Sequence, residues 1–391
     1  MNRFRKFNLI LISTIFLVFG IEYIAGKAYK HLKNNTQLEK NLSFHRARLA
    51  NLYEGYTWEK DYFDDLKINK PSKLAYFPYA MWVAKDRRGM VEQDSNGIRT
   101  SYQPIKNGKK VYRIYIFGGS TVENIQVPNE STIASILVKK LSESPLKEKY
   151  DFEIINFGNG AYNNTQSLIR FLYEYQRDFV DYGKPSHLIF YDGGNDIFSG
   201  VYLERPGIHD AFDRIKLRYE NLLSFLALKV REYINNNVNL IKLINHFAKK
   251  NEEDLRYFET RKMNYQDLAI ETKEIYQKNI ELLRKIVIKE NVNLDFFIQP
   301  TIYTQKNQSS HDKSVLEIWN IKRPKMNKAF LEGHKELSKL SDNNQDVHNL
   351  SSIYDNIDSP IFKDYIHTGP LGIEIVANEI YQKVFYNLSK D

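Results

Sequence analysis

Short hydrophobic segments recur along this chain from Val111 onward, and the first three end in glycine and small polar residues. They are rich in isoleucine, phenylalanine, leucine and tyrosine, a composition typical of buried strands. Four segments predict strands: Val111–Phe117, Phe152–Phe157, His187–Asp192 and Leu294–Ile298. Because helix-forming stretches separate them, the pattern predicts an α/β fold, with a parallel sheet and helices on both of its faces.

Apolar residues at helical spacing mark the segments between and after these strands. Helices are predicted at Ser131–Leu141, about Tyr265–Lys289 and Leu371–Tyr386. The second should bury a stripe formed by Leu268, Ile275, Leu282, Leu283 and Ile286. Between about residues 200 and 262 the chain is charged and helix-forming, which predicts a helical insertion that serves as a lid, a partner surface or a membrane contact.

The first 27 residues combine a basic leader with an apolar segment. Phe7–Ile21 is almost wholly apolar and follows three basic residues within the first six, a pattern typical of a signal anchor with its amino end in the cytoplasm. We therefore expect one transmembrane helix in residues 1–27 and an extracytoplasmic body. Cleavage near the small pair Ala25-Gly26, which would give a secreted protein, is the alternative.

Residues 28–95 are expected to form a stalk and a pre-domain segment. The sequence is polar and tyrosine-rich to about Lys70, and it predicts a helical stalk through Leu52. Prolines and turn pairs in residues 71–110 predict short strands and turns. The main domain should then extend over residues 96–391.

Charge and composition exclude several classes of function. The net charge is +8, but residues 1–33 hold six basic side chains and one acidic one, and no basic stripe interleaved with aromatic residues follows. We therefore expect no nucleic-acid partner. The chain has no cysteine, which excludes disulfides and a cysteine nucleophile. No histidine pair has metal-ligand spacing and no phosphate-binding loop is present, so we expect neither metal nor cofactor.

The ends of the first three strands predict a site. They read Gly118-Gly119-Ser120, Gly158-Asn159-Gly160 and Gly193-Gly194-Asn195-Asp196. In parallel sheets ligands bind beyond the carboxyl ends of the strands. A serine that follows two glycines at such an end is placed as a nucleophile, although the same residues would also suit an ordinary turn between a strand and a helix.

Acyl-transfer chemistry needs more than a hydroxyl group. It requires a base, a group that orients the base, and donors for the oxyanion. His367 is the candidate base and Asp364 the candidate orienting group, because both precede a Gly-Pro turn that opens the last helix. Candidate donors are the N–H of Ser120, the N–H of Gly160 or Ala161, and the side-chain amide of Asn195. The alternative interpretation of Asn195 is an ordinary turn residue.

Four segments together resemble the sequence blocks of the SGNH (GDSL-like) hydrolase family. They are Phe117-Gly-Gly-Ser-Thr121, Asn156-Phe-Gly-Asn-Gly-Ala-Tyr162, Gly193-Gly-Asn-Asp196 and Asp364-Tyr-Ile-His367. The resemblance implies a three-layer α/β/α flavodoxin-like core. It also implies that Ser120 is the nucleophile, that Asn195 is an oxyanion donor and that Asp364 and His367 complete a triad. Asn96-Gly-Ile-Arg99 is similar to bacterial members that carry an N-terminal membrane segment, which implies a bacterial cytoplasmic membrane.

This chain departs from the family pattern at two points. Gly119 replaces the aspartate of Gly-Asp-Ser, which leaves the nucleophile unchanged. The second-block glycine falls at Ala161 when it is counted from Asn156, or at Gly160 if one residue is missing. The donor there is a backbone N–H, so alanine can supply it.

The resemblance implies a serine esterase that hydrolyses an O-acyl ester. Together with the expected anchor, it suggests an O-acetyl group on a cell-envelope carbohydrate, although a small acylated molecule is also compatible. An O-acyltransferase to an envelope polysaccharide would use the same triad. A catalytically silent glycan-binding scaffold is the alternative of another class.

Overall fold

The computed structural model describes residues 3–34, 50–69, 71–247, 263–342 and 344–389. It divides the chain into two compact units, which are described separately. Unit 1 comprises Met1–Phe44 and Ala211–Arg261, and unit 2 comprises His45–Asp210 and Lys262–Asp391.

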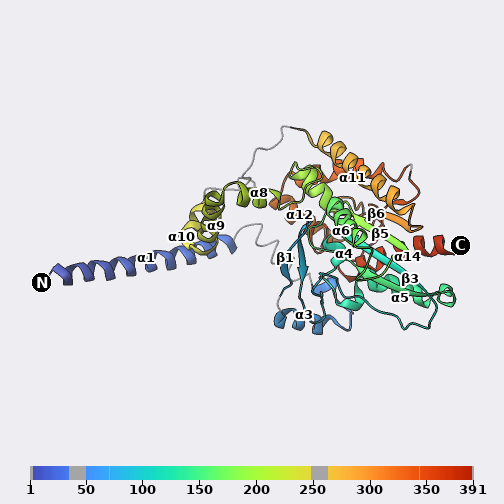
Figure 1. The fold of residues 1–391 in the computed structure, drawn as a ribbon. Coiled ribbons are helices and arrows are strands. Elements are labelled where there is room, and N and C mark those ends of the chain that lie inside the picture. Colours follow the sequence, from blue (N-terminus) through green and yellow to red (C-terminus); the bar gives the residue numbers. More distant parts are fainter. Residues whose placement is uncertain (1–2, 35–49, 70, 248–262, 343, 390–391) are drawn as a thin grey trace. The chain divides into compact units, whose positions relative to one another are not determined.

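A five-stranded parallel sheet forms the centre of unit 2 (Figure 1). Its strands are β3 (Lys110–Gly118), β4 (Tyr150–Asn156), β5 (His187–Asp192), β6 (Asn293–Ile298) and β7 (Val347–Asn349). They lie in the order β4-β3-β5-β6-β7, which is the flavodoxin-like order. The expected α/β fold class is therefore confirmed, and all four strands that the sequence predicts are present within two residues of their expected ends.

Helices cover both faces of this sheet. α5 (Ile133–Glu143) packs against α14 (Pro370–Leu388) on one face, and α6 (Asn164–Gln176) packs against α11 (Tyr265–Val287) on the other (Figure 1). The remaining helices that follow β3 in unit 2 are α4 (Ser120–Glu123), η2 (Asn129–Ser131), η3 (Pro145–Glu148), α7 (Gly194–Ile197), η4 (Phe198–Tyr202), α12 (Ser310–Lys322) and α13 (Met326–Ser338).

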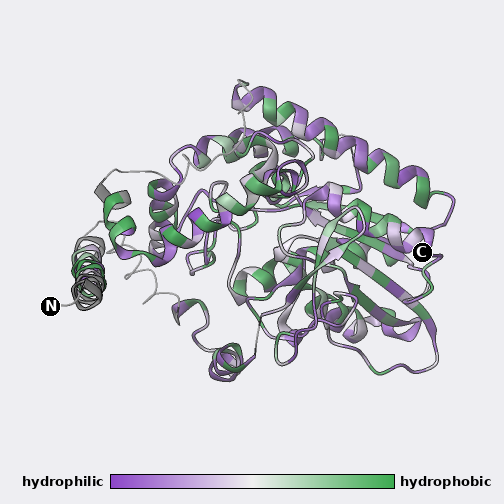
Figure 2. Ribbon diagram, turned by 60° about the vertical axis from the view of Figure 1, so that its left-hand side comes forward, coloured by the Kyte–Doolittle hydropathy of each residue, from purple (hydrophilic) through white to green (hydrophobic). Residues whose placement is uncertain are grey.

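Local sequence accounts for where these helices begin. A capping box starts α6, because the Asn163 side chain accepts from the N–H of Gln166 while the Gln166 side chain accepts from the N–H of Asn163. Asn264 caps α11 in a similar way by accepting from the N–H of Asp267. Hydrophobic and hydrophilic residues alternate along the turns of α11 (Figure 2). Leu282, which we expected in its buried stripe, is instead 43% exposed.

The sequence pattern missed one strand, β7. It has only three residues, of which His348 and Asn349 are polar, and it pairs with β6 at the edge of the sheet. A strand that is paired on one side and this short produces no hydrophobic run, so the sequence pattern gives no signal for it.

Residues 50–95 belong to unit 2, where they form η1 (Ala50–Leu52), α3 (Glu59–Ile68) and an antiparallel hairpin of β1 (Lys73–Phe77) and β2 (Met81–Lys85). Leu52, Tyr53, Tyr62 and Val91 form a small buried cluster beneath α3. Most of the expected helical stalk, residues 35–49, lies outside the described residues.

Unit 1 contains helices from two distant parts of the chain. They are α1 (Arg3–Asn34), α8 (Phe212–Glu220), α9 (Leu222–Asn237) and α10 (Asn239–Phe247). The last part of the expected insertion, residues 248–262, lies outside the described residues. Where α1 and α10 pack together, Ala25 is buried and a Cβ at Gly26 would lie 2.9 Å from Asn239 Nδ2. The small pair that the sequence suggested for cleavage thus lies at a helix contact.

The only acidic side chain of α1 takes part in the same contact. Glu22 accepts hydrogen bonds from the N–H groups of Asn239 (2.8 Å) and Leu240 (3.1 Å), at the first turn of α10. Carboxylates are stabilised at helix N-termini by these free N–H groups. α1 covers the segment in which we expected a membrane span, but no helix among the described residues is long and apolar enough to cross a membrane.

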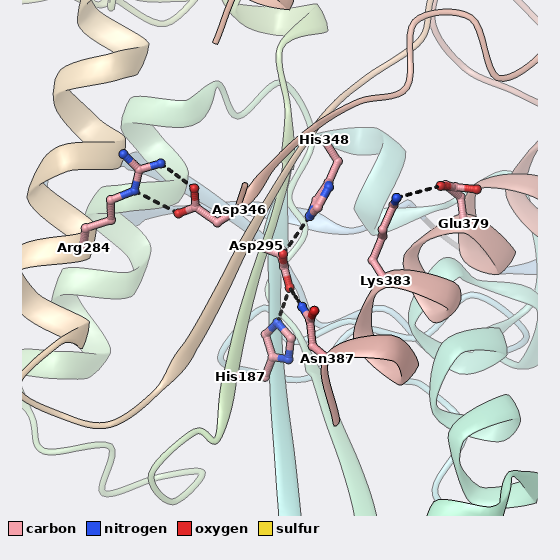
Figure 3. A network of polar contacts seen from close by, with 8 residues as sticks. All are labelled: His187, Arg284, Asp295, Asp346, His348, Glu379, Lys383 and Asn387. Carbon is pink, nitrogen blue, oxygen red and sulfur yellow. Dashed lines mark hydrogen bonds and ion pairs between the residues drawn. The ribbon is translucent and has the colours of Figure 1, made fainter. Parts of the chain in front are cut away.

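A polar network joins β5, β6, β7 and α14 (Figure 3). The Asp295 carboxylate lies between His187 Nε2 (2.8 Å) and His348 Nε2 (2.7 Å), and Asn387 Nδ2 is 3.5 Å from it. Burial favours a higher pKa for Asp295, but the hydrogen bonds and charges of the two histidines outweigh it, so the pKa lies below the ordinary value. Asp295 therefore remains charged and connects three strands and the last helix.

We expect Asp295→Asn to lower the free energy of unfolding by about 3 kcal/mol at pH 7, because His187 is fully buried and would lose its charged partner. Since the folded-state pKa of Asp295 is lowered, its contribution is complete above the unfolded value of about 3.9 and is lost as the pH falls through the folded value. Urea unfolding at several pH values measures the difference in free energy of unfolding between the original protein and Asp295→Asn. This difference should become smaller only below about pH 4.

Asp346→Asn is the matched control. Asp346 pairs with Arg284 of α11, whereas Asp295 contacts Asn387 of α14 (Figure 3), and both side chains of the Asp346–Arg284 pair are about one-third exposed. Such a pair contributes less than about 1 kcal/mol. Equal losses in the two variants would contradict the role given to Asp295.

Candidate active site

The turn between β3 and α4 leaves no room for side chains at two successive positions. A Cβ at Gly118 would lie 2.4 Å from the Tyr191 carbonyl oxygen, and a Cβ at Gly119 would lie 2.4 Å from Asn195 Nδ2. Glycine at both positions therefore lets the strand turn sharply, so that Ser120 stands at the start of α4. A Cβ at Gly119 would also lie 2.8 Å from the Tyr162 carbonyl oxygen.

Ser120, His367 and Asp364 lie within hydrogen-bonding distance of one another. Ser120 Oγ is 2.6 Å from His367 Nε2, and His367 Nδ1 is 2.7 Å from Asp364 Oδ2. When His367 carries its proton on Nδ1, it donates to Asp364 and accepts from the serine hydroxyl. The structure thus brings together three side chains that the sequence places at two distant positions.

A local turn explains the spacing of Asp364 and His367. Asp364 Oδ1 accepts from the N–H groups of Ile366 (2.9 Å) and His367 (2.8 Å), which leaves Oδ2 for the His367 ring. Burial favours a higher pKa for Asp364, but the charge of His367 and these hydrogen bonds hold the pKa below the ordinary value. The carboxylate is therefore charged and fixed in direction.

The loops after β4 and β5 meet beside Ser120. Asn195 Nδ2 donates to the Tyr162 carbonyl oxygen (2.8 Å), and that same oxygen is 2.8 Å from the position that a Cβ would take at Gly119. The N–H of Asn159 donates to the Gly118 carbonyl oxygen (3.0 Å). All three predicted strand ends are therefore adjacent, as expected for neighbouring parallel strands.

Ala161 has a left-handed backbone, with φ of 63°. Left-handed residues are usually glycine, and alanine adopts this conformation at a cost of about 1 kcal/mol. This is the position at which counting from Asn156 places the second-block glycine. Gly160, its neighbour, has a negative φ, and its carbonyl oxygen accepts from Trp82 Nε1 (2.9 Å).

Sequence reasoning did not identify the hairpin of β1 and β2 as part of this site. Trp82 holds the Gly160 carbonyl, and the Tyr162 hydroxyl donates to the Trp82 carbonyl oxygen. The N–H of Ala84 donates to Asn159 Oδ1 (3.2 Å). The hairpin thus fixes the turn that follows β4. The lone tryptophan in a short strand was the only available signal, and it does not reveal its partner.

Arg99 and Glu123 support the turn that carries Ser120. Arg99 is fully buried, and it donates to the carbonyl oxygens of Glu123 (3.0 Å) and Val127 (3.1 Å). Gln93 Nε2 donates to Glu123 Oε1 (2.9 Å). Burial raises the pKa of Glu123, although Gln93, Arg99 and His367 partly oppose the shift. Arg99 therefore holds the chain after α4 in place.

Three other polar residues near the predicted strand ends have structural partners. Asp196 accepts from the N–H groups of Asn164 and Gly193, both at 3.1 Å, and burial raises its pKa to about 7. Asp192 is buried and accepts from Ser167, and burial raises its pKa strongly. His187 belongs to the Asp295 network.

The arrangement has the parts that acyl transfer requires: a hydroxyl group, a base, an oriented carboxylate, and N–H groups from three adjacent loops. Among the described residues, no group of three histidine, aspartate or glutamate side chains is placed to hold a metal ion.

The model of the family described as GDSL-like Lipase/Acylhydrolase matches residues 114–380 of this chain. No curated protein matches the chain.

Solved structures give distant similarities. A lipase from a goat rumen metagenome is 10% identical, with 69% of this chain and 95% of that chain covered and a TM-score of 0.39. A mutant of an acetyl-xylooligosaccharide esterase from Geobacillus stearmophilus is also 10% identical, with 71% and 94% covered and a TM-score of 0.36. A psychrotrophic esterase from Pseudoalteromonas is 14% identical, with 71% and 98% covered and a TM-score of 0.35.

The family model covers more than half of the chain, and the core of unit 2 has the flavodoxin-like strand order that the resemblance implied. The expectation of an SGNH hydrolase is confirmed: this chain is an ester-hydrolysing enzyme that belongs to the GDSL-like lipase/acylhydrolase family.

Proposed function

We propose that the enzyme hydrolyses O-acyl esters through a Ser120-His367-Asp364 triad. The observation that carries this proposal is the chain of two short contacts, 2.6 Å from Ser120 to His367 and 2.7 Å from His367 to Asp364. His367 removes the serine proton as Ser120 attacks the ester carbonyl, and Asp364 stabilises the resulting imidazolium. His367 then protonates the leaving alcohol, and water releases the acid from the acyl-enzyme.

The oxyanion is proposed to bind donors from the three strand ends. They are the N–H of Ser120, the N–H of Gly160 or Ala161, and the amide of Asn195. The left-handed backbone of Ala161 favours Ala161 as the equivalent of the second-block glycine. The Asn195 amide has two N–H groups, and only one is directed to the Tyr162 carbonyl. Donors fixed in advance stabilise the transition state without reorganisation.

The cavity beside the base has no room for a long acyl chain. The cavity that His367 lines together with Tyr191, Ile366 and Ile373 has a volume of about 10 Å³. Such a space holds about one water molecule. We propose acetyl as the acyl group.

We propose that the sugar of an acetylated carbohydrate binds in a second cavity of unit 2, which none of the three triad residues lines. Its volume is about 220 Å³, which is large enough for a sugar ring. The side chains that line it combine aromatic rings with charged groups, and they include Tyr76, Phe77, Tyr173, Arg170, Glu174 and Tyr182. Aromatic walls with a few polar groups are typical of sites for small ligands. The hairpin that lines this cavity also contacts the Gly160 turn.

Ser120→Ala should lower kcat for p-nitrophenyl acetate by at least about 10⁴-fold, because no other hydroxyl group takes over the nucleophilic step. Steady-state kinetics of the purified full chain measure this loss. Ser142→Ala is the control, because Ser142 bonds only within α5 and should keep full activity. Normal turnover by Ser120→Ala, or loss of activity in both variants, would disprove the assignment.

Trp82→Phe should lower kcat about tenfold with little change in KM. The variant loses the hydrogen bond to the Gly160 carbonyl, so the adjoining N–H is held less firmly for the oxyanion, which forms only in the transition state. Separate determination of kcat and KM tests this positioning role. Trp58→Phe alters another tryptophan of unit 2 and serves as the control. An increase in KM alone would mean that Trp82 contacts the substrate instead.

Tyr76→Ala should raise KM for an acetylated oligosaccharide about tenfold, a loss of about 1.4 kcal/mol of binding. It should leave hydrolysis of p-nitrophenyl acetate unchanged, because Tyr76 lines the larger cavity and is 70% exposed. Leu74→Ala changes an equally exposed residue of the same strand and is the control. Equal kinetics for both variants would exclude sugar binding in this cavity.

A further inference from the structure

An exposed apolar surface of unit 1 lies along one side of α9. Six exposed apolar side chains occur in this helix of 16 residues. They are Leu222, Leu223, Leu226, Val230, Tyr233 and Ile234, with exposed fractions between 38% and 80%. At 3.6 residues per turn all six fall within about 120° of the helix circumference. Among the described side chains, this side of α9 is therefore apolar and uncovered.

α1 is apolar on all sides over one part of its length. Phe16, Leu17, Val18 and Phe19 are consecutive, so they point in four directions around the helix, and each is more than half exposed. A helix that is hydrophobic all round is normally buried in a core or in lipid.

The positive charge of the protein is concentrated in the two segments that contain α1 and α8 to α10. Residues 3–34 hold six basic side chains and one acidic one, and residues 211–247 hold six basic and three acidic ones. Together they account for the whole net charge of +8. The only acidic side chain of α1, Glu22, is held by the first N–H groups of α10. The two segments that carry the apolar faces therefore have a net positive charge.

We propose that the apolar face of α9, together with the apolar turns of α1, binds the surface of a lipid bilayer that contains anionic phospholipids. The apolar side chains would lie at the boundary between head groups and hydrocarbon, and the basic side chains would lie near the phosphates. A second copy of the chain is a poorer occupant, because it would bring the same positive charge to the contact. This proposal does not depend on the chemistry assigned to Ser120.

The chain has no cysteine, so one introduced thiol reports from one chosen position of the full-length protein. Leu226→Cys places an environment-sensitive fluorophore on the apolar face of α9. Ser224→Cys places it about 160° away on the same helix and is the matched control, because Ser224 is also exposed. Ester hydrolysis by both labelled variants verifies that unit 2 is folded, and circular dichroism verifies that the helices are retained.

The probe membranes are vesicles of phosphatidylcholine with and without phosphatidylglycerol. With anionic vesicles we expect a blue shift at position 226, quenching by a nitroxide attached to the lipid chains, and loss of quenching by iodide. Position 224 should remain open to iodide. Neutral vesicles or about 0.5 M salt should weaken the response at position 226, because salt screens the basic side chains.

Several outcomes would overturn the proposal. One is that the labelled protein does not bind anionic vesicles. Another is that it binds while both positions remain exposed to iodide, which would restrict the contact to α1. A blue shift at position 226 that appears without vesicles and grows with protein concentration would identify a second copy as the occupant. An equal and salt-independent response to neutral vesicles would exclude recognition of anionic lipid.

Discussion

The close approach of three strand ends around Gly118 and Gly119 is the constraint on which the rest of this site depends. Neither position has room for a Cβ, because the Tyr191 carbonyl, the Tyr162 carbonyl and the Asn195 amide lie against them. Parallel pairing of β3 with β4 and β5 brings those groups to one edge. Any side chain at these two positions would push the loops apart. The position of Ser120 therefore depends on the absence of side chains at Gly118 and Gly119.

Hydrogen bonds and nearby charges keep two buried carboxylates, Asp364 and Asp295, in their charged form. Asp364 is buried, which alone would favour its neutral form, yet two backbone N–H groups and His367 keep it charged. The same principle acts in the Asp295 network, where two histidines hold a buried carboxylate in its charged form. In both places hydrogen bonds offset desolvation. Those of Asp364 come from its own turn, whereas those of Asp295 come from β5 and β7, so Asp295 also connects these strands.

The hairpin of β1 and β2 extends the site beyond the family core. It precedes residues 114–380, the part that the family model matches, and it contacts the turn of Gly160 through Trp82 and Ala84. The same hairpin lines the cavity of about 220 Å³. The hairpin therefore joins a contact to the turn after β4 with one wall of this cavity.

Local sequence by itself determined the strands, the principal helices and the type of chemistry. Hydrophobic runs, glycine pairs and helix caps act over a few residues, so β3 to β6, α11 and the candidates Ser120, Asp364, His367 and Asn195 are readable from the chain. Only the tertiary structure decided what depends on distant partners. Those features are the pairing of β7, the placement of residues 50–95 in unit 2, the contact from Trp82 to Gly160, and the hydrogen bonds of Glu22 with α10. Each of these features depends on contacts between residues that lie far apart in the sequence. No local sequence pattern identifies the distant contact.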